Sequence, residues 1–509
     1  MKKILLKITY AFLVTIMLFG CEKFLAEDPR GLLTPINFYN SDNEVKLAVN
    51  GTYVQFSRSH DLYKGQGNSS SLPYFYQWGS DEINNGRLAG GGYPYSLYIF
   101  SEGVNESKGT WRDLYNIIQN CNALLSKIED NDKITESCYK QSRGEVLFVR
   151  ALAYYHLTNI WGNVPYYREG TSIDEIMVLG RFDKNQIQLD MIEDLKEAQT
   201  LLPDIYPDSE RGRATKWVAA TLMAKFFMVR SDWQGMRDKS IEIINNSWHK
   251  LLDDYGAIFN TFPLEEYNDE IIFSFSYVID VAKQTYTDNY NPRLADEPKV
   301  ASQRNALKQA LSARDEGFTG YGQCFVTPEM IKTYPADDLR RPWNIITNYL
   351  GFELKYAYIP KLWNLHQINS PRANHGDNLI VYRLADIYLM AAEAENELNG
   401  PANAYQYVNK VRERAYDPDK PLSGLNKETF RQAVRDERKW ELFGENHRRL
   451  DLIRWGILVE TIKNTEFTAL FAPANTNIKP HHVLWPIPVE EFNLNPALLE
   501  SDPSNNGYR

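Results

Sequence analysis

The chain has few cysteines: the sequence of 509 residues contains only Cys21, Cys121, Cys138 and Cys324. Cys21 ends an N-terminal apolar run, which leaves an odd number for the rest of the chain. Domains that depend on disulfides carry a dense and usually even set of cysteines. The sequence therefore excludes a disulfide framework, and a hydrophobic core must hold the fold. A content of 43% hydrophobic residues is ample for that core.

Long apolar runs are also scarce. After Cys21 no stretch is long and apolar enough to cross a bilayer. Before it, Lys2, Lys3 and Lys7 precede the apolar run Ile8–Gly20, which is the pattern of a secretory signal. The run ends in the letters LFGC, which resemble the cleavage site of a bacterial lipoprotein. We therefore expect residues 1–20 to be a signal peptide and residues 21–509 to form one domain.

The same site predicts that Cys21 is acylated and becomes the new N-terminus. Two or more acyl chains anchor a protein stably, because each buried CH₂ contributes about 0.8 kcal/mol. Phe19 is bulkier than the residue that is usual at this position of a lipoprotein site. An ordinary cleaved signal with a free cysteine beside it is the alternative.

The chain lacks an excess of basic residues. Residues 1–20 carry three lysines and no acid, so their removal changes the formal net charge from −10 to −13. A protein that binds a phosphate backbone needs an uncompensated basic surface. We therefore predict that the chain does not bind nucleic acid.

Catalytic motifs are missing as well. The sequence has no G-x-S-x-G elbow, H-E-x-x-H helix, Walker loop or C-x-x-C pair. The glycine-rich GFTGYG at Gly317–Gly322 follows no clear strand and precedes no clear helix, so we interpret it as a flexible loop. The sequence predicts no metal site, no cofactor and no enzyme. Paired carboxylates for glycoside hydrolysis stay open, because they meet only in the folded structure.

What the chain does have is helical periodicity over about residues 108–260 and 380–465. Apolar residues recur at steps of three and four along 109–128, 144–161, 187–202, 217–227, 384–398, 404–415, 427–443 and 447–463. Short breaks separate these alanine-rich, aromatic helices into pairs. Such pairs are typical of a tetratricopeptide-like repeat, in which stacking buries the faces that one pair leaves exposed. We predict a mainly α fold with a few short strands.

Two long polar stretches interrupt the helices, at about residues 58–107 and 262–376. They are rich in Gly, Asn, Tyr and Pro, and Glu270–Tyr277 is the one clear strand among them. Long loops in a compact protein usually carry function. We expect the ligand-binding face here.

The densest charge lies in Glu437–Gly456, ERKWELFGENHRRLDLIRWG. Three interpretations compete: a catalytic site, a nucleic-acid patch or a structural ion-pair network. The acids nearly balance the bases, and pairs spaced by three or four residues stitch helices together. We therefore predict a structural network that includes Glu437, Glu441, Arg448, Asp451 and Arg454.

Several segments together resemble the SusD/RagB family, the surface lipoproteins of Bacteroidetes nutrient-uptake systems. The segments are CEKFLAEDP at Cys21–Pro29, WGSDE at Trp78–Glu82, FVRALAYYHLTNIWGNVPYY at Phe148–Tyr167, RATKWVAATLMAKFF at Arg213–Phe227, NDEIIFSFSY at Asn268–Tyr277, VYRLADIYLMAAEAEN at Val381–Asn396 and LWPIPVEEFNLNPALLES at Leu484–Ser501. The resemblance covers nearly the whole mature chain. It implies a non-enzymatic lipoprotein on the extracellular face of the outer membrane that captures a glycan for a partner TonB-dependent (SusC-like) transporter. It leaves open a peptide-binding member of the family, and less favourably a surface glycoside hydrolase.

Sugars stack their C–H faces on aromatic rings and pair their hydroxyls with polar side chains. The candidates for such contacts in the two polar stretches are Tyr74, Trp78, Asn84, Arg87, Tyr93, Tyr286, Tyr290, Trp343 and Trp363. Each of them could instead pack in the core.

Overall fold

The computed structural model describes residues 38–59, 72–85, 93–259, 267–363, 365, 372 and 374–509. The expected signal peptide and Cys21 lie outside these residues. The described chain is mainly α with a few short strands, as predicted, and its helices form a tetratricopeptide-like scaffold. None of its helices is both long and apolar enough to span a bilayer.

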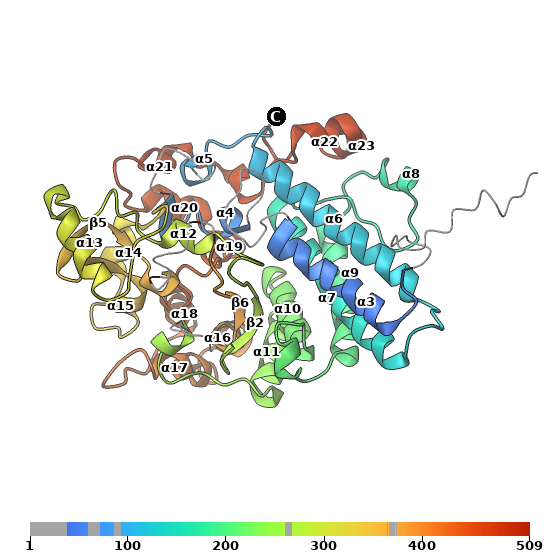
Figure 1. The fold of residues 1–509 in the computed structure, drawn as a ribbon, viewed down its shortest axis with the longest axis horizontal. Coiled ribbons are helices and arrows are strands. Elements are labelled where there is room, and N and C mark those ends of the chain that lie inside the picture. The colour runs from blue at the N-terminus through green and yellow to red at the C-terminus, as the bar shows by residue number, and fades with distance from the viewer. Residues whose placement is uncertain are drawn as a thin grey trace, which may run out of the picture.

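Long helices form the N-terminal half of the scaffold. They are α3 (Asp42–Val54), α6 (Asn105–Ile128), α7 (Glu136–Trp161), α9 (Lys184–Leu201), α10 (Lys216–Val229) and α11 (Trp233–Asn246). Thr135 and Thr215 cap α7 and α10 by accepting backbone N–H groups, and Gly162 ends α7 with a φ of 77°. In Figure 1, α3, α6, α7 and α9 lie together on the right, and α6–α7, α7–α9, α9–α10 and α10–α11 pack as neighbours.

A second set of helices follows in the C-terminal half: α16 (Leu384–Asn399), α17 (Tyr405–Arg412), α18 (Lys427–Glu441), α19 (Arg448–Arg454) and α20 (Leu458–Asn464). Helix α16 packs against α11, which joins the two halves. We predicted one helix over 447–463, and that is wrong: Trp455 caps α19, and Gly456 has a φ of 72° that a continuous helix does not allow. Short helices α8 (Ile173–Ile176), α21 (Pro473–Asn477), α22 (Val489–Leu494) and α23 (Ala497–Ser501) complete the scaffold.

The two polar stretches contain more regular structure than we predicted. The first has α4 (Leu72–Tyr76), β1 (Ile83–Asn85) and α5 (Tyr93–Leu97). The second has β2 (Ile271–Phe275), α12 (Tyr286–Tyr290), α13 (Arg304–Ser312), β3 (Cys324–Val326), α14 (Pro328–Thr333), α15 (Arg341–Asn344), β4 (Ile346–Tyr349) and β5 (Phe352–Tyr358), and β6 (Leu379–Arg383) follows it. The expectation of one strand is wrong because β4 and β5 carry polar residues and lack a clear alternation. Their turn at Leu350 and Gly351 has two positive φ angles, as in a tight hairpin.

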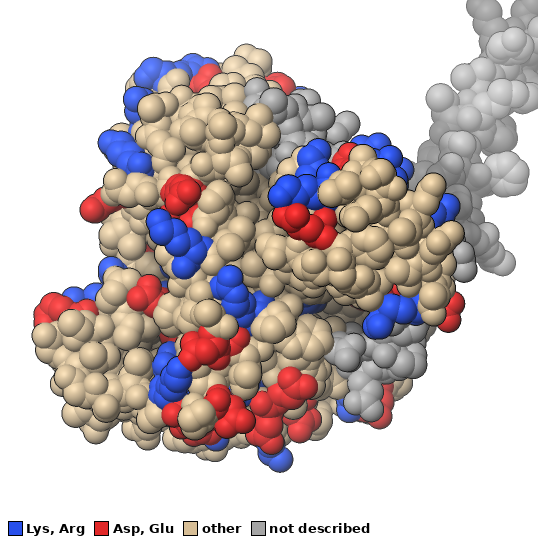
Figure 2. All heavy atoms as spheres, turned by 90° about the vertical axis from the view of Figure 1, so that its left-hand side faces the viewer, with Lys and Arg blue, Asp and Glu red and all other residues tan. Residues whose placement is uncertain are grey.

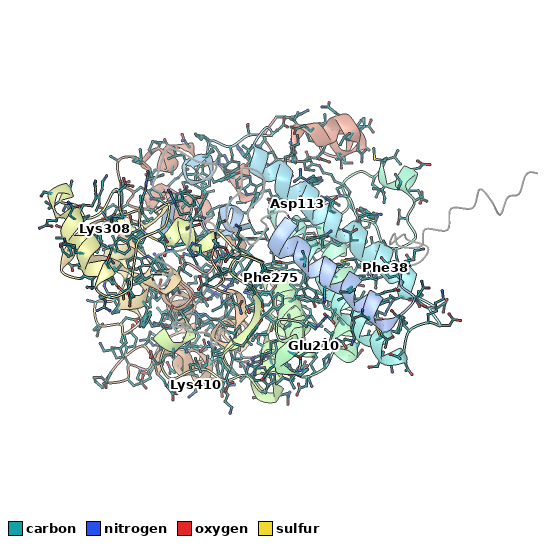
Figure 3. All side chains as sticks on the ribbon, viewed as in Figure 1. Phe38, Asp113, Glu210, Phe275, Lys308 and Lys410 are labelled. Carbon is teal, nitrogen blue, oxygen red and sulfur yellow. The ribbon has the colours of Figure 1, made fainter. Side chains whose placement is uncertain are left out.

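The strands described here form three antiparallel pairs, β1–β3, β2–β6 and β4–β5. Phe275, near the middle of the molecule in Figure 3, ends β2, which lies in the main core. That core runs from Val45 to Leu498 and takes side chains from both helical halves. A separate small core joins α13, β3 and β5 at the left-hand end of Figure 1.

Candidate functional site

Four of the predicted ligand-binding residues are buried. Trp78, Asn84, Tyr286 and Tyr290 are exposed by 3% or less. The hydroxyl of Tyr290 donates to the side-chain oxygen of Gln77 at 2.5 Å, and the rings of Tyr286 and Tyr290 lie 4.9 Å apart. Trp78, Tyr286 and Tyr290 belong to the main core. Such burial does not favour contact with a ligand, although Tyr286 also lines the small cavity described below. Direct contact of these four residues with a ligand stays a prediction.

The remaining candidates divide into two groups. Arg87 lies outside the described residues, and for Tyr74 in α4 and Tyr93 in α5 only the backbone is described. Trp343 and Trp363 are both half-buried. Trp343 packs on Gly256, where a Cβ atom would lie 2.2 Å from its ring. Among the candidates whose side chains are described, Tyr286 and Trp363 line one cavity and Tyr290 packs on Tyr286, whereas Trp343 packs elsewhere.

A cavity of about 90 Å³ lies beside Trp363. Tyr286, Lys361, Glu445 and Asn446 line it together with Trp363. The ammonium group of Lys361 donates to Glu445 at 2.6 Å. Burial lowers the pKa of Lys361 to about 8, although Glu445 opposes the shift. The charged stretch at 437–456 thus supplies one wall of this cavity, which sequence reasoning did not predict.

The core of the predicted ion-pair network is present and buried. Glu437 and Glu441 both accept from the guanidinium of Arg340, at 2.6 and 2.7 Å. Glu441 also pairs with Arg383 at 2.5 Å and with Arg414 at 2.7 Å. Burial alone would raise the pKa of Glu441, but the three arginines outweigh it and hold the pKa well below its usual range. An acid that stays ionised among three cations is a poor proton donor, which argues against general acid catalysis here.

The other predicted members are paired too. Asp451 accepts from Arg438 at 2.9 Å and from Arg454 at 2.8 Å. Arg454 also binds Glu393 at 2.6 Å. Burial would raise the pKa of Asp451, but its two arginine partners lower it below the usual range. All five predicted residues thus form ion pairs in the structure, and the purely structural role of the network stays a prediction.

Two cations of this network pair with a carboxylate of the first polar stretch. Arg448 donates to both oxygens of Asp81 at 2.8 and 2.9 Å, and Lys439 reaches the same carboxylate at 2.9 Å. The carbonyls of Asp81 and Glu82 accept from the hydroxyl and the backbone N–H of Thr327, at 2.6 and 2.9 Å. These bonds hold β1 beside β3. The network therefore fixes the strand that follows the glycine-rich loop.

That loop lines a larger, open hollow of about 370 Å³. The lining residues come from the chain after α12 and from the glycine-rich loop, with one arginine from a third segment: Arg293, Leu294, Ala295, Phe318, Thr319, Gly320 and Arg372. Phe318 packs edge-on against Trp363 at 5.5 Å, so these two rings separate the hollow from the cavity. The hollow belongs to the end of the molecule that carries α13 and β5 (Figure 1).

Backbone hydrogen bonds set the two main walls of the hollow. Tyr321 donates to the carbonyl of Asp288 at 2.6 Å, and Gly322 donates to that of Asn291 at 2.9 Å. Gly320 comes so close to Asn291 that a Cβ atom would lie 2.1 Å from its carbonyl oxygen. Only glycine permits this approach. The interpretation of 317–322 as merely a flexible loop is wrong: close packing explains its glycines.

Sequence reasoning missed Arg293, Phe318 and Arg372. The glycine-rich loop was the available signal for Phe318, because glycines mark places where two backbones meet. Nothing in the local sequence pointed to Arg372, which reaches the hollow only through the fold. Within the described part of the chain, no group of three or more His, Cys, Asp and Glu side chains is placed to hold a metal ion.

Two parts of the chain match models of known protein families. Residues 346–508 match the model of the SusD family. Residues 99–228 match a second model, described as "Starch-binding associating with outer membrane".

Named relatives agree. The chain is 45% identical to SusD-like protein P25 of Formosa agariphila over 99% of both chains. It is 22% identical to the starch-binding protein SusD of Bacteroides thetaiotaomicron over 75% of each chain.

Solved structures share the fold. A laminarin-binding SusD-like protein superposes with a TM-score of 0.72 at 23% identity, covering 90% of this chain and 98% of the other. Surface glycan-binding protein A of Bacteroides thetaiotaomicron, in complex with laminarihexaose, gives a TM-score of 0.71 at 21% identity, covering 89% and 97%.

Proposed function

The chain belongs to the SusD/RagB family, and from that membership we propose that it is a surface glycan-binding lipoprotein. In this proposal it captures oligosaccharide or polysaccharide chains and delivers them to a partner TonB-dependent outer-membrane transporter. The starch-binding and laminarin-binding relatives support the glycan as ligand. The description of the second matching family model supports the outer membrane as location.

The open hollow between the 291–295 segment and the glycine-rich loop carries the proposal. Its lining includes the exposed side chains of Arg293 and Arg372, with buried Phe318 and partly buried Thr319 packed in the wall behind them. The hydroxyl groups of a sugar need polar partners, and the two guanidinium groups supply hydrogen-bond donors for them.

The ligand leaves this surface without being cleaved. Glycoside hydrolysis needs two carboxyl groups about 5–9.5 Å apart at the bound sugar. None of the described residues that line the hollow has a carboxyl group. Binding and release are then the whole task of the chain.

Calorimetric titration with a panel of polysaccharides and peptides tests the proposal, with product analysis of the same mixtures. We expect binding of at least one polysaccharide with a Kd between about a micromolar and a millimolar, because two or three stacking contacts contribute only about 0.5–1.5 kcal/mol each beyond area burial. Cleaved product from the purified protein would contradict the non-catalytic role. Binding of peptides alone would replace the glycan with a peptide as ligand.

The anchor needs its own test. A lipid on Cys21 would keep the protein in the outer-membrane fraction, so Cys21→Ala protein should appear in the soluble fraction instead. Fractionation followed by immunoblotting measures this, with Cys121→Ala as the control, because Cys121 is buried in α6. A Cys21→Ala protein that stays membrane-bound would exclude acylation at this residue as the anchor.

A further inference from the structure

The charged side chains among the described residues that line the open hollow are all of one sign. Among the described residues that line it, Arg293 and Arg372 are charged and no acid is present. This contrasts with the chain as a whole, which has a formal net charge of −10. Figure 2 looks onto this end of the molecule, where red and blue side chains are interspersed over broad uncharged surface. A purely cationic hollow is therefore a local feature.

Both arginines are exposed and available to a ligand. Within the described part of the chain, neither has an ion pair or a side-chain hydrogen bond. Other arginines without an acidic partner still donate to backbone carbonyls: Arg341 binds that of Tyr334 at 2.8 Å, and Arg449 binds that of Phe75 at 3.1 Å. The guanidinium N–H groups of Arg293 and Arg372 can thus donate to solvent or to a ligand.

The hollow also orients these donors. The guanidinium of Arg372 lies over the ring of Tyr321, 5.0 Å from its centroid. Stacking on one face leaves the N–H groups at the edge of the guanidinium free to donate. The buried hydroxyl oxygen of Thr319, a residue that lines the same hollow, has no hydrogen-bond partner among the described residues. Buried Phe318 packs in the wall behind them.

We propose that the hollow selects an acidic glycan, one that bears sulfate or carboxylate groups, over a neutral one. This inference rests on the proposed function and names the ligand class of the same site. A guanidinium matches the planar pair of oxygens on a sulfate or carboxylate and can donate two parallel hydrogen bonds to it. The two arginines of the hollow could then bind two acidic groups of the glycan, or one acidic group and the sugar next to it.

The acidic character of the remaining surface strengthens the selection. A polyanion is repelled by a chain of negative net charge except where cations are unpaired. Binding should therefore favour this hollow and weaken as salt increases, because salt screens the attraction between the exposed guanidinium groups and the acidic groups of the glycan. A neutral glycan would show no such salt dependence.

Matched pairs of polysaccharides test this choice. Affinity electrophoresis and calorimetry would compare κ-carrageenan with its desulfated form, and polygalacturonate with its methyl ester, at low and high ionic strength. Laminarin and starch serve as neutral references. The first pair isolates sulfate and the second isolates carboxylate, because the sugar backbone stays the same within each pair.

The variants are Arg293→Gln, Arg372→Gln and both together, and the control is Lys308→Gln. Lys308 is an exposed lysine on α13, labelled at the left in Figure 3, and its replacement removes the same charge nearby. We expect the wild type to bind an acidic polysaccharide at least about tenfold more tightly than its neutral form. Each arginine variant should lose about tenfold of that affinity, because it removes charged hydrogen bonds to the acidic group. Arg372→Lys should retain part of it.

Four results would overturn the inference. If neutral forms bind as tightly as the acidic ones, or if Lys308→Gln weakens binding as much as the arginine variants, the acidic preference fails while glycan binding stands. If the wild type binds only laminarin or starch, the ligand is a neutral glycan. If no polysaccharide binds at all, the proposed function fails together with the inference.

Discussion

Arginines play opposite parts in two regions of this molecule. In the ion-pair network of 437–454, the buried guanidinium of Arg340 faces three carboxylates, those of Asp338, Glu437 and Glu441, at 2.6–2.7 Å. In the open hollow, Arg293 and Arg372 face none among the described residues. The same side chain thus holds the scaffold in one region and is offered to solvent in the other.

Desolvation explains the difference. A buried charge without a partner costs several kcal/mol, so every cation in the network must be paired. An exposed arginine is solvated by water and has no such need. Whether an arginine has an acidic partner therefore distinguishes the scaffold from the proposed site in this chain. The residues next to the arginine in the sequence distinguish them less well. The predictions below test that separation, beginning with the largest effect.

Removing the central acid of the network should cost the most stability. Glu441→Gln leaves Arg340, Arg383 and Arg414 with one carboxylate fewer, in an environment where Glu441 is fully buried. We expect a loss of about 3–5 kcal/mol in the free energy of unfolding, measured by urea denaturation.

The control for this change is Glu413→Gln. Glu413 pairs with Lys410, which is labelled in Figure 3, at 2.5 Å, but both side chains are about half-exposed. Exposed pairs contribute about 0–1 kcal/mol, so this variant should remain close to the wild type. Equal losses in both variants would show that burial of the network does not matter.

Arg448→Ala should have a smaller effect of the same kind. It removes both bonds to Asp81, but Lys439 stays within 2.9 Å of that carboxylate. We expect a loss of about 2 kcal/mol and a lower Tm, because charged hydrogen bonds contribute about 1.5–3 kcal/mol. The ligand affinity of the folded fraction should be nearly unchanged. A stable Arg448→Ala protein that binds no ligand would move this arginine from the scaffold into the site.

The stability of the scaffold should depend on pH in a range where ligand binding in the hollow does not. His156 on α7 is buried, with its ring nitrogen 2.9 Å from the hydroxyl of Tyr76. Burial lowers the pKa of His156 to about 3, whereas an unfolded histidine has a pKa of about 6.5. Unfolding therefore takes up a proton between these values, and stability falls as the pH drops below about 6.5.

At pH 5 this single group should cost about 2 kcal/mol of the stability present above pH 7. His156→Gln cannot titrate, so its free energy of unfolding should change less between pH 7 and pH 5 than that of the wild type. Burial also lowers the pKa of His249 to about 4 and that of His482 to about 3. These two residues should therefore keep part of the pH dependence of the free energy of unfolding in the variant. Binding of a sulfated glycan by the arginines should stay constant over this range. An unchanged slope in His156→Gln would exclude this source of acid sensitivity.

The smallest effect on stability should come from the hollow itself. Arg293→Gln and Arg372→Gln remove exposed charges with no ion pair in the described part of the chain, and such surface changes usually alter stability by less than about 0.5 kcal/mol. Thermal unfolding measures this, with the wild type as reference. A drop in Tm as large as that of Glu441→Gln would show that these arginines have structural partners, and the contrast between the regions would disappear.

The long helices and the charge network could be predicted from the sequence. Apolar residues spaced by three and four residues mark α6, α7 and α16, and the balance of acids and bases over 437–456 indicates ion pairing. Both signals are local, so a single sequence contains them. The break between α19 and α20 is also local, at Gly456, but the apolar pattern continues across it and concealed it.

The site could be predicted only in part. An aromatic residue in a polar stretch looks the same whether it packs inward, as Tyr286 and Tyr290 do, or faces solvent. Arg293 and Arg372 lie almost 80 residues apart in the chain and meet only through the fold. Their lack of partners is a property of three-dimensional surroundings, which no local pattern of residues encodes.

Hydrogen–deuterium exchange with and without a bound polysaccharide tests the central contrast most directly. The probe is the polysaccharide that binds best in the titrations above. The account predicts that binding protects backbone amides in 291–295 and 317–322, while exchange in α16, α18 and α19 is unchanged. Protection confined to those helices, with none around the hollow, would contradict it.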